Sequence, residues 1–216
     1  MRDRSLYIKR KFILLIGLFC LFMSIHTWSH ANPVILVLGD SLSAEYGLPR
    51  GSGWVSLLEA QLKKINSPAS VFNASISGET TAGGLTRLPA LLASKKPAVV
   101  MIELGANDAL RGLPLSETEA NLRKMIGMSK KLGAKVLLFG MQIPPNYGQS
   151  YTNQFKALYP SLAKEEKIDL IPFFLAGVAT RPELFQADRI HPNVAAQTIL
   201  FNNVWGAMGP YQPLLK

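Results

Sequence analysis

Three polar residues from two distant parts of the chain are of the types that together perform acyl transfer: Ser41, Asp188 and His191. A serine hydroxyl is a poor nucleophile until a histidine accepts its proton, and a carboxylate must hold that histidine in the correct tautomer. His191 is the only histidine after position 31. Because Asp188 lies three residues before His191, a single turn can bring the carboxylate and the imidazole together. The residue types therefore predict a serine nucleophile with a base and an orienting acid.

Both motifs also have a purely structural interpretation. Gly39-Asp40-Ser41 consists of residues that are common in turns. Asp188-x-x-His191-Pro192 is also typical of a turn that caps a helix, since Asp and Pro are frequent near helix starts. Pro192 disfavours helical backbone at His191, so we expect the histidine in a turn before the last helix. Asp40 is a rival orienting acid, but its position beside Ser41 at a strand end predicts that it points to the opposite side.

Acyl transfer also needs hydrogen-bond donors for the developing oxyanion, and two residues fit this role. The backbone N–H of Gly78 can approach closely because glycine has no Cβ, and the side-chain amide of Asn107 donates without adding a charge. When it is ionised, the Asp108 side chain can only accept hydrogen bonds, so it cannot donate to an oxyanion. Each residue alone is explained as loop punctuation. Their occurrence in one ordered set with Ser41, Asp188 and His191 favours a shared site.

The elements that position these residues alternate between strands and helices. Residues 34–38 form a short, non-alternating apolar run, which is typical of a buried parallel strand, and they lead directly into Gly39-Asp40-Ser41. Ser116-x-x-Glu119 is typical of a capping box. Further strands are expected at 70–74, 98–104, 135–140 and 169–171, and helices at 54–65, 82–94, 116–132, 151–167 and 193–208. This alternation predicts an α/β fold, a three-layer α/β/α sandwich with a five-stranded parallel sheet, whose carboxyl edge binds the ligand.

The first 31 residues differ from the rest of the chain. Five basic residues precede an apolar run, 12–23, and Ser29-His30-Ala31 supplies small residues for cleavage. This pattern predicts a signal peptide, 1–31, followed by one hydrolase domain, 32–216, with a periplasmic location. The run is shorter than the ~20 residues that span a bilayer, which disfavours the alternative of an uncleaved anchor. Cys20 lies behind Phe19, which disfavours a lipid anchor on this cysteine.

Charge and residue counts exclude several function classes. The chain of 216 residues carries a net charge of +9, but residues 32–216 hold 18 basic and 13 acidic residues, a balance of +5. No basic run with interleaved aromatic residues occurs there, which argues against nucleic-acid binding. With one histidine and no cysteine after position 31, a multi-histidine or cysteine metal site is excluded. We expect no metal and no cofactor.

Four segments of the chain resemble the conserved blocks of the SGNH, or GDSL, hydrolases. They are Gly39-Asp40-Ser41-Leu42-Ser43, Asn73-Ala74-Ser75-Ile76-Ser77-Gly78, Gly105-Ala106-Asn107-Asp108 and Asp188-x-x-His191-Pro192. The chain is most similar to the bacterial periplasmic group of thioesterase I, lysophospholipase and arylesterase enzymes, and the similarity covers the whole of 32–216. The resemblance implies a flavodoxin-like sheet, Ser41 as nucleophile, His191 as base and Asp188 as orienting acid. It also implies an oxyanion hole made of the Ser41 and Gly78 N–H groups and the Asn107 side chain.

The resemblance further implies which residues border the acyl chain of the substrate. These residues are Ala109, Leu110, Leu113, Ile143, Pro144 and Tyr147. Two positions depart from the family pattern: Ala106 stands where relatives often have glycine, and Arg189 stands where glycine is frequent between the aspartate and the histidine. Both departures concern the shape of the pocket and the mobility of its loop, and neither removes a catalytic group.

These observations predict a periplasmic serine esterase that acts as a monomer on small acyl substrates. The expected substrates are aryl and acyl carboxylic esters, acyl thioesters and lysophospholipids, with no nucleic acid and no stable membrane insertion after signal cleavage. Two alternatives stay open. A carbohydrate O-deacetylase would use the same site on the same fold, and a non-catalytic periplasmic lipid or acyl carrier would keep the pocket without turnover.

Overall fold

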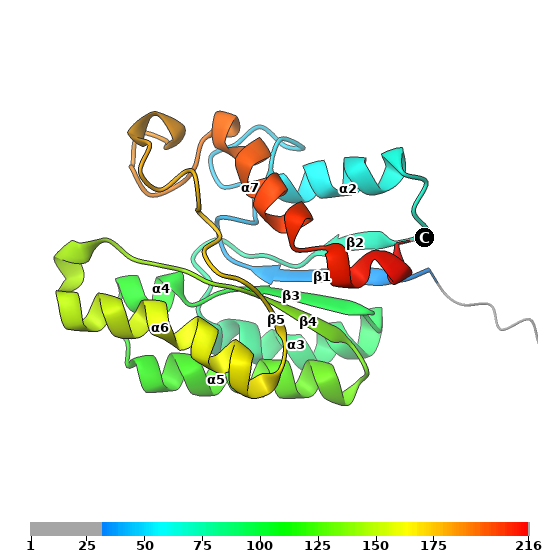
Figure 1. The fold of residues 1–216 in the computed structure, drawn as a ribbon, viewed down its shortest axis with the longest axis horizontal. Helices are drawn as coiled ribbons and strands as arrows, with labels where there is room; N and C mark the ends of the chain where they lie inside the picture. The colour runs from blue at the N-terminus through cyan, green and yellow to red at the C-terminus, as the bar shows by residue number, and fades with distance from the viewer. Residues whose placement is uncertain (1–31, 216) are drawn as a thin grey trace, which may run out of the picture. The chain divides into compact units, whose positions relative to one another are not determined.

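The computed structural model describes residues 32–215, and Figure 1 shows how their strands and helices are arranged. The expected signal peptide, 1–31, lies outside the described residues. Within 32–215, no helix is both long enough and apolar enough to span a bilayer.

Five parallel strands form the central sheet. They are β1 (Val34–Gly39), β2 (Ser70–Asn73), β3 (Val99–Glu103), β4 (Lys135–Phe139) and β5 (Asp169–Ile171), in the spatial order β2-β1-β3-β4-β5. The residues of β3, and those of β1 after the first, are buried, because helices cover both faces of the sheet. The prediction of a three-layer α/β/α fold with a five-stranded parallel sheet is confirmed.

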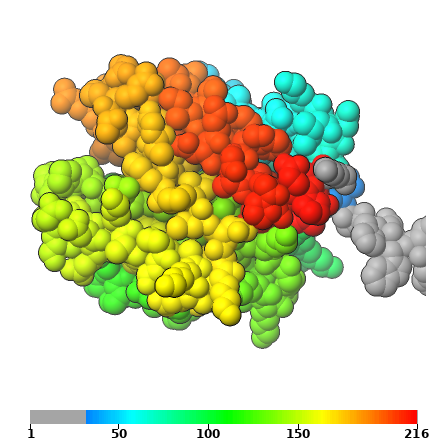
Figure 2. All heavy atoms as spheres, viewed as in Figure 1, coloured from blue at the N-terminus to red at the C-terminus, as the bar shows by residue number. Residues whose placement is uncertain are grey.

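Helices pack on both faces of this sheet. The described α-helices are α2 (Trp54–Lys64), α3 (Thr81–Lys95), α4 (Ala106–Leu110), α5 (Leu115–Lys131), α6 (Gln149–Glu166) and α7 (Val194–Gly206), and the 3-10 helices are η1 (Pro145–Tyr147), η2 (Pro182–Leu184) and η3 (Gly209–Leu214). Figure 1 shows α2 and α7 on one face and α3, α5 and α6 on the other. Figure 2 shows α7 and η3, orange to red, packed against the yellow segment around β5.

The core of the α2 and α7 face contains an aromatic cluster. The ring of Trp54, at the start of α2, lies 5.6 Å from the rings of both Phe139 and Phe174, and the last two are 5.0 Å apart. All three side chains are fully buried. At the far end of the sheet the buried Tyr211 of η3 donates its hydroxyl to the Val136 carbonyl at 3.1 Å. These contacts fix α2 and the C-terminal segment on the sheet that carries the site.

The expected capping box at the start of one helix was wrong. Helix α5 begins at Leu115 after Pro114, and no side chain caps it. The predicted capping box does not form because Ser116 already lies inside the helix and Glu119 reaches Arg123 instead, at 2.7 Å. The last helix begins at Val194, one residue after the predicted start, and Pro192 precedes its N-cap.

The start of α7 is capped by a side chain that the sequence reasoning did not single out. Asn193 accepts a hydrogen bond from the Ala195 N–H at 3.0 Å, so an asparagine satisfies the free donor at the helix start. The helix ends at Gly206 rather than at 208, and the chain continues as η3. The predicted helix and its observed counterpart therefore share their position but not their terminal turns.

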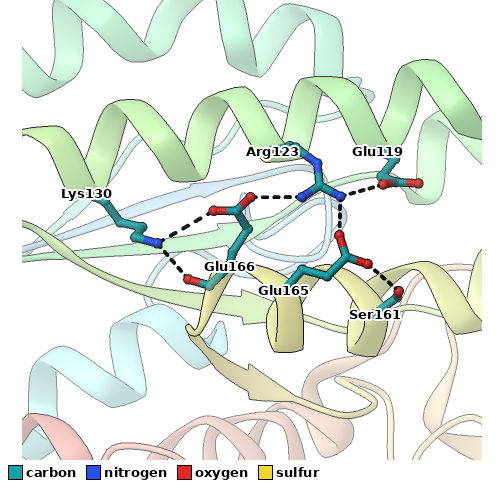
Figure 3. A network of polar contacts seen from close by, with 6 residues as sticks. All are labelled: Glu119, Arg123, Lys130, Ser161, Glu165 and Glu166. Atoms are coloured by element: carbon teal, nitrogen blue, oxygen red, sulfur yellow. Dashed lines mark hydrogen bonds and ion pairs between the residues drawn. The ribbon is translucent and has the colours of Figure 1, made fainter.

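A network of charged side chains joins α5 to α6 (Figure 3). Arg123 of α5 contacts Glu119 and Glu165 at 2.7 Å and Glu166 at 2.9 Å, and Lys130 reaches the Glu166 carboxylate at 3.6 Å. Single exposed ion pairs contribute about 0–1 kcal/mol, so the network holds the two helices in register rather than carrying the stability of the fold. None of its residues belongs to the candidate site.

Candidate active site

The candidate site lies where the strand order reverses, between β1 and β3. Ser41 follows β1, Asn107 follows β3, and Gly78 follows the neighbouring strand β2. Because all strands are parallel, their carboxyl ends meet at one edge of the sheet, toward the left of Figure 1. Ligands of open α/β sheets bind at this switch point.

Ser41, His191 and Asp188 form a continuous chain of hydrogen-bonding contacts. The Ser41 Oγ lies 2.9 Å from His191 Nε2, and His191 Nδ1 lies 2.6 Å from Asp188 Oδ2. Both distances are within the range of ordinary hydrogen bonds. With Nδ1–H directed at the carboxylate, Nε2 is free to accept the serine proton. The structure thus brings Ser41 to Asp188 and His191 although 150 positions separate Ser41 from His191.

The Asp188 side chain also organises the turn that carries His191. Its Oδ1 accepts hydrogen bonds from the N–H groups of Ile190 at 2.9 Å and His191 at 3.0 Å. The backbone bond from His191, followed by the bond to the imidazole and the backbone bond from Ile190, lowers the pKa of Asp188 to about 2, although burial opposes the shift. Arg189 adopts a left-handed backbone with φ of 57°. This conformation explains why glycine suits the position, because a Cβ disfavours it.

Two residues that the sequence reasoning missed hold His191 from its other sides. The Tyr46 ring lies 4.4 Å from the imidazole ring, centre to centre, and is tilted by 41°. The Gln186 N–H donates to the His191 carbonyl at 2.8 Å, and its side-chain amide donates to the Tyr46 carbonyl at 2.8 Å. Gln186 therefore links the loop after β1 to the turn of His191. No residue type or spacing in these two loops predicted the contact.

The backbone N–H groups of Ser41 and Gly78 are the two main-chain candidates for an oxyanion hole. Neither donates a hydrogen bond to an atom of residues 32–215. Gly78 has a φ of 77°, a left-handed conformation that glycine adopts without strain. Its carbonyl accepts a hydrogen bond from the Arg111 guanidinium at 2.8 Å. Arg111 thus holds the peptide that follows Gly78, and the Gly78 N–H, in the peptide before it, is free of any acceptor among the described residues.

Asn107 lies in the first turn of the short helix α4, which the sequence reasoning treated as loop. Its side-chain nitrogen donates to Asp40 Oδ2 at 2.8 Å. A carboxamide carries two N–H hydrogens, so one is held by Asp40 and the other is available to a ligand. Asp40 contacts Asn107 rather than His191, and its second oxygen accepts from the Leu42 N–H at 3.0 Å.

A second buried carboxyl group, that of Glu103, lies beneath the turn after β1. Its Oε2 accepts from the Ser43 hydroxyl at 2.8 Å and the Asp40 N–H at 3.2 Å, while its Oε1 has no partner within residues 32–215. A Cβ at Gly39 would lie 2.8 Å from that Oε2, so the close approach requires glycine. The sequence signal that could have pointed to Glu103 is a charged residue at the end of an otherwise apolar strand.

Burial determines the protonation states of the Glu103 and Asp40 carboxyl groups. Desolvation raises the pKa of Glu103 well above its usual range, and repulsion from Asp40 acts in the same direction. Burial also raises the pKa of Asp40, to about 6, although hydrogen bonds from Leu42 and Asn107 oppose it. The unpartnered Oε1 favours a protonated Glu103, which leaves Asp40 as the ionised acceptor for Asn107 at neutral pH.

Asp108, the neighbour of Asn107, points into the protein. Its carboxylate accepts hydrogen bonds from both the N–H and the hydroxyl of Thr81. This contact ties α4 to the first turn of α3 and leaves Asp108 as an acceptor. Among residues 32–215, no group of three or more His, Cys, Asp or Glu side chains could hold a metal ion.

The residues expected to border the acyl chain differ in exposure. Leu113, Pro144 and Tyr147 are exposed and Leu110 is half-buried, whereas Ile143 and Ala109 are buried. Ala109 has no exposed surface and packs in the core, so its side chain does not line an open pocket. The loop around Leu113 is held by Tyr151, whose hydroxyl donates to the Leu113 carbonyl at 2.9 Å.

This fold and this arrangement of residues define a carboxylic ester hydrolase. The sequence model of the GDSL-like lipase/acylhydrolase family matches residues 37–199. The chain belongs to this family.

Relatives of the chain are similar over most of its length. The chain is 49% identical over 191 residues to "Esterase TesA" of Pseudomonas aeruginosa, covering 88% of this chain and 95% of that protein. It is 44% identical over 186 residues to "Thioesterase 1/protease 1/lysophospholipase L1" of Escherichia coli, covering 86% of each chain. A solved structure described as "Crystal Structure of TesA" aligns with a TM-score of 0.80 at 50% identity, covering 84% of this chain and 99% of that one.

Proposed function

We propose that the protein is a serine esterase in which Ser41 is the nucleophile, His191 the general base and Asp188 the residue that orients the imidazole. The observation that carries this proposal is the unbroken chain of contacts, 2.9 Å and 2.6 Å, from the Ser41 hydroxyl through His191 to Asp188. Ionised Asp188 holds the hydrogen on Nδ1 and stabilises the imidazolium that forms in the reaction.

In the first half of the reaction, the Ser41 Oγ attacks the carbonyl carbon of the ester and its proton passes to His191 Nε2. The carbonyl oxygen becomes an oxyanion, which the N–H groups of Ser41 and Gly78 and the Asn107 amide stabilise. Collapse of this intermediate breaks the bond to the alcohol or thiol. His191 donates its proton to that leaving group, and an acyl ester remains on Ser41.

In the second half, water replaces the leaving group. His191 accepts a proton from the water, whose oxygen attacks the acyl carbon and forms a second oxyanion in the same hole. The bond to Ser41 then breaks and His191 returns the proton to the Ser41 Oγ. The products are a carboxylic acid and the free enzyme, and the cycle uses neither a metal nor a cofactor.

The proposed substrates are aryl and acyl esters, acyl thioesters and lysophospholipids. The names of the relatives support this range, and so do the apolar residues Leu110 and Leu113, which follow Asn107 in the chain, and Tyr147 of η1 after β4. A series of p-nitrophenyl esters of increasing acyl length, run against acetylated sugars, tests the substrate class. Faster hydrolysis of the acyl series is expected, and a preference for acetylated sugars would instead support a carbohydrate deacetylase.

Reaction with an organophosphonate tests the nucleophile. Stoichiometric labelling of Ser41, located by peptide mass spectrometry, is expected, with loss of esterase activity in proportion to the label. A chain that is not labelled and does not turn over any ester of the series would be a lipid or acyl carrier.

We also propose that the protein is exported to the periplasm and acts there as a monomer. The basic start, the short apolar run and Ser29-His30-Ala31 support export. Sequencing of the mature protein should begin at Asn32, whereas recovery of the full-length chain from the membrane fraction would contradict the proposal. Light scattering of the mature protein should give the mass of one chain.

A further inference from the structure

Exposed large apolar side chains gather at the edge of the sheet that carries the site. Residues 32–215 contain eight such side chains, and six of them lie in segments that follow the strands or flank His191. These six are between 37% and 53% exposed: Tyr46, Ile76, Leu113, Tyr147, Ile190 and Val194. The other two, Ile65 and Leu132, lie at the opposite edge, just after α2 and α5.

Three of the six side chains lie close to the proposed reacting groups, in space or along the chain. The Tyr46 ring contacts the imidazole ring at a tilt of 41°, Ile190 is the residue before His191, and Ile76 lies two residues before Gly78. Because the strands are parallel, the loops that hold them extend from one edge, toward the left of Figure 1. We call these six residues the apolar rim. Single exposed apolar residues need no explanation, whereas a cluster beside a site marks an interaction surface.

Two exposed arginines lie at this edge without an ion-pair partner among the described residues. Arg111, at the end of α4, and Arg189, in the His191 turn, are exposed, and neither forms an ion pair with a residue of 32–215. Two nearby carboxylates are neutralised by arginines, since Glu79 pairs with Arg87 and Glu183 with Arg181. Asp40, Glu103 and Asp108 are buried. The carboxylates of Asp188 and Glu45 are ionised but accept hydrogen bonds from their own loops, Asp188 from the His191 turn and Glu45 from the Gly51 and Gly53 N–H groups.

We propose that the apolar rim docks reversibly on an anionic phospholipid surface. The rim would enter the boundary between headgroups and acyl chains, while Arg111 and Arg189 lie against lipid phosphates. This inference rests on the proposed function, because docking would place Ser41 where an acyl ester leaves the lipid layer. A second copy of the chain is a poorer occupant of this surface, since its symmetric contact would bring four unpaired arginines together.

The test measures binding of the mature enzyme to sedimented vesicles made from ether-linked lipids, which contain no ester for the enzyme to cleave. Binding is expected to vesicles with ether-linked phosphatidylglycerol and to be weak with ether-linked phosphatidylcholine alone. The double variant Ile190→Ser with Val194→Ser should lower the partition coefficient at least about tenfold. Arg189→Gln should lower it about fivefold, the effect of ~1 kcal/mol for one basic residue near the surface.

Matched controls come from the opposite edge of the sheet. Ile65→Ser with Leu132→Ser removes two exposed apolar side chains, and Lys64→Gln removes one charge, so both should leave binding within twofold of the parent. If Lys64→Gln lowers binding as much as Arg189→Gln, and the two apolar double variants also bind equally, then only the net charge of the protein attracts the vesicle. That result, or no binding to either vesicle, would overturn the docking proposal.

Failure of docking is distinguishable from failure of the proposed function. Each variant is also assayed with a water-soluble short-chain aryl ester, which needs no lipid surface. Val194→Ser, at a position outside the His191 turn, should bind vesicles more weakly than the parent and still hydrolyse this ester at the parental rate. If the parent hydrolyses the soluble ester but does not bind vesicles, docking alone is wrong. A parent that hydrolyses no ester would refute the proposed function and, with it, the reason for docking.

Discussion

The Asp40 carboxylate and the Asn107 side-chain amide are joined by a hydrogen bond of 2.8 Å across the carboxyl ends of β1 and β3. The residue next to the proposed nucleophile therefore positions the proposed oxyanion donor. Its other oxygen accepts from the Leu42 N–H at 3.0 Å, so both oxygens are in use. Asp40 is a positioning residue in this arrangement, since it touches Asn107 and not the reacting atoms.

The Asp40→Asn variant tests this relationship. Asparagine has one acceptor oxygen, so either the Leu42 N–H or the Asn107 amide loses its partner. We expect kcat to fall by about one to two orders of magnitude with little change in KM, because the oxyanion donor is misplaced. Steady-state kinetics with an aryl ester measure the split between kcat and KM. A folded variant with kcat within twofold of the parent would show that Asn107 does not need Asp40.

Removal of the oxyanion donor itself should have a larger effect. Asn107→Ala is expected to lower kcat by about two to three orders of magnitude, the usual loss for one such donor, with a far smaller change in substrate affinity. The double variant with Asp40→Asn should be little worse than Asn107→Ala alone, because the aspartate acts through the asparagine. A fall of less than about fivefold would mean that Asn107 is only a loop residue.

The proposed nucleophile and base should behave as one unit. Ser41→Ala and His191→Ala should each remove nearly all activity, and the double variant should be little worse than either. Asp188→Asn should also lower kcat strongly, because the amide cannot hold the hydrogen on Nδ1. Rates with an aryl ester decide the matter. Activity of His191→Ala within tenfold of the parent would require another base for Ser41.

The pH dependence of kcat/KM should show loss of activity on the acid side. The imidazole must be neutral to accept the Ser41 proton, so protonation of His191 inactivates the enzyme. Asp188, with a pKa of about 2, stays ionised while His191 becomes protonated, so it adds nothing to the loss of activity on the acid side. Protonation of Asp40, whose pKa is about 6, weakens the acceptor for Asn107. The acid limb should therefore be shallower in Asp40→Asn than in the parent, and equal slopes would contradict this assignment.

Glu103 should make the protein less stable as the pH rises. Its folded-state pKa is raised by burial, so the folded state keeps a proton that the unfolded state releases above about pH 4.3. The free energy of unfolding should thus decrease from pH 5 to pH 8 in the parent, and Glu103→Gln should flatten this slope. Urea unfolding at both pH values measures it. A variant whose slope equals that of the parent would show that Glu103 is not protonated in the folded state.

The local signals in the sequence were sufficient for the order of the strands and helices and for the residues of the proposed triad. The apolar run 34–38 ending in Gly39 predicted β1, and a chain with one histidine after position 31 leaves His191 as the only candidate base of that type. Signals of this kind are contained within a few neighbouring residues. Composition and spacing therefore carry them without reference to the rest of the fold.

The tertiary structure alone decided which side chains support these residues. Glu103 meets Gly39 because β3 pairs with β1 in a particular register, and Tyr46 and Gln186 meet at His191 although 140 positions separate them. The bonds from Arg123 to Glu165 and Glu166 likewise exist only because α5 packs on α6. Contacts of this kind depend on strand register and helix packing, which are set by the burial of the whole core.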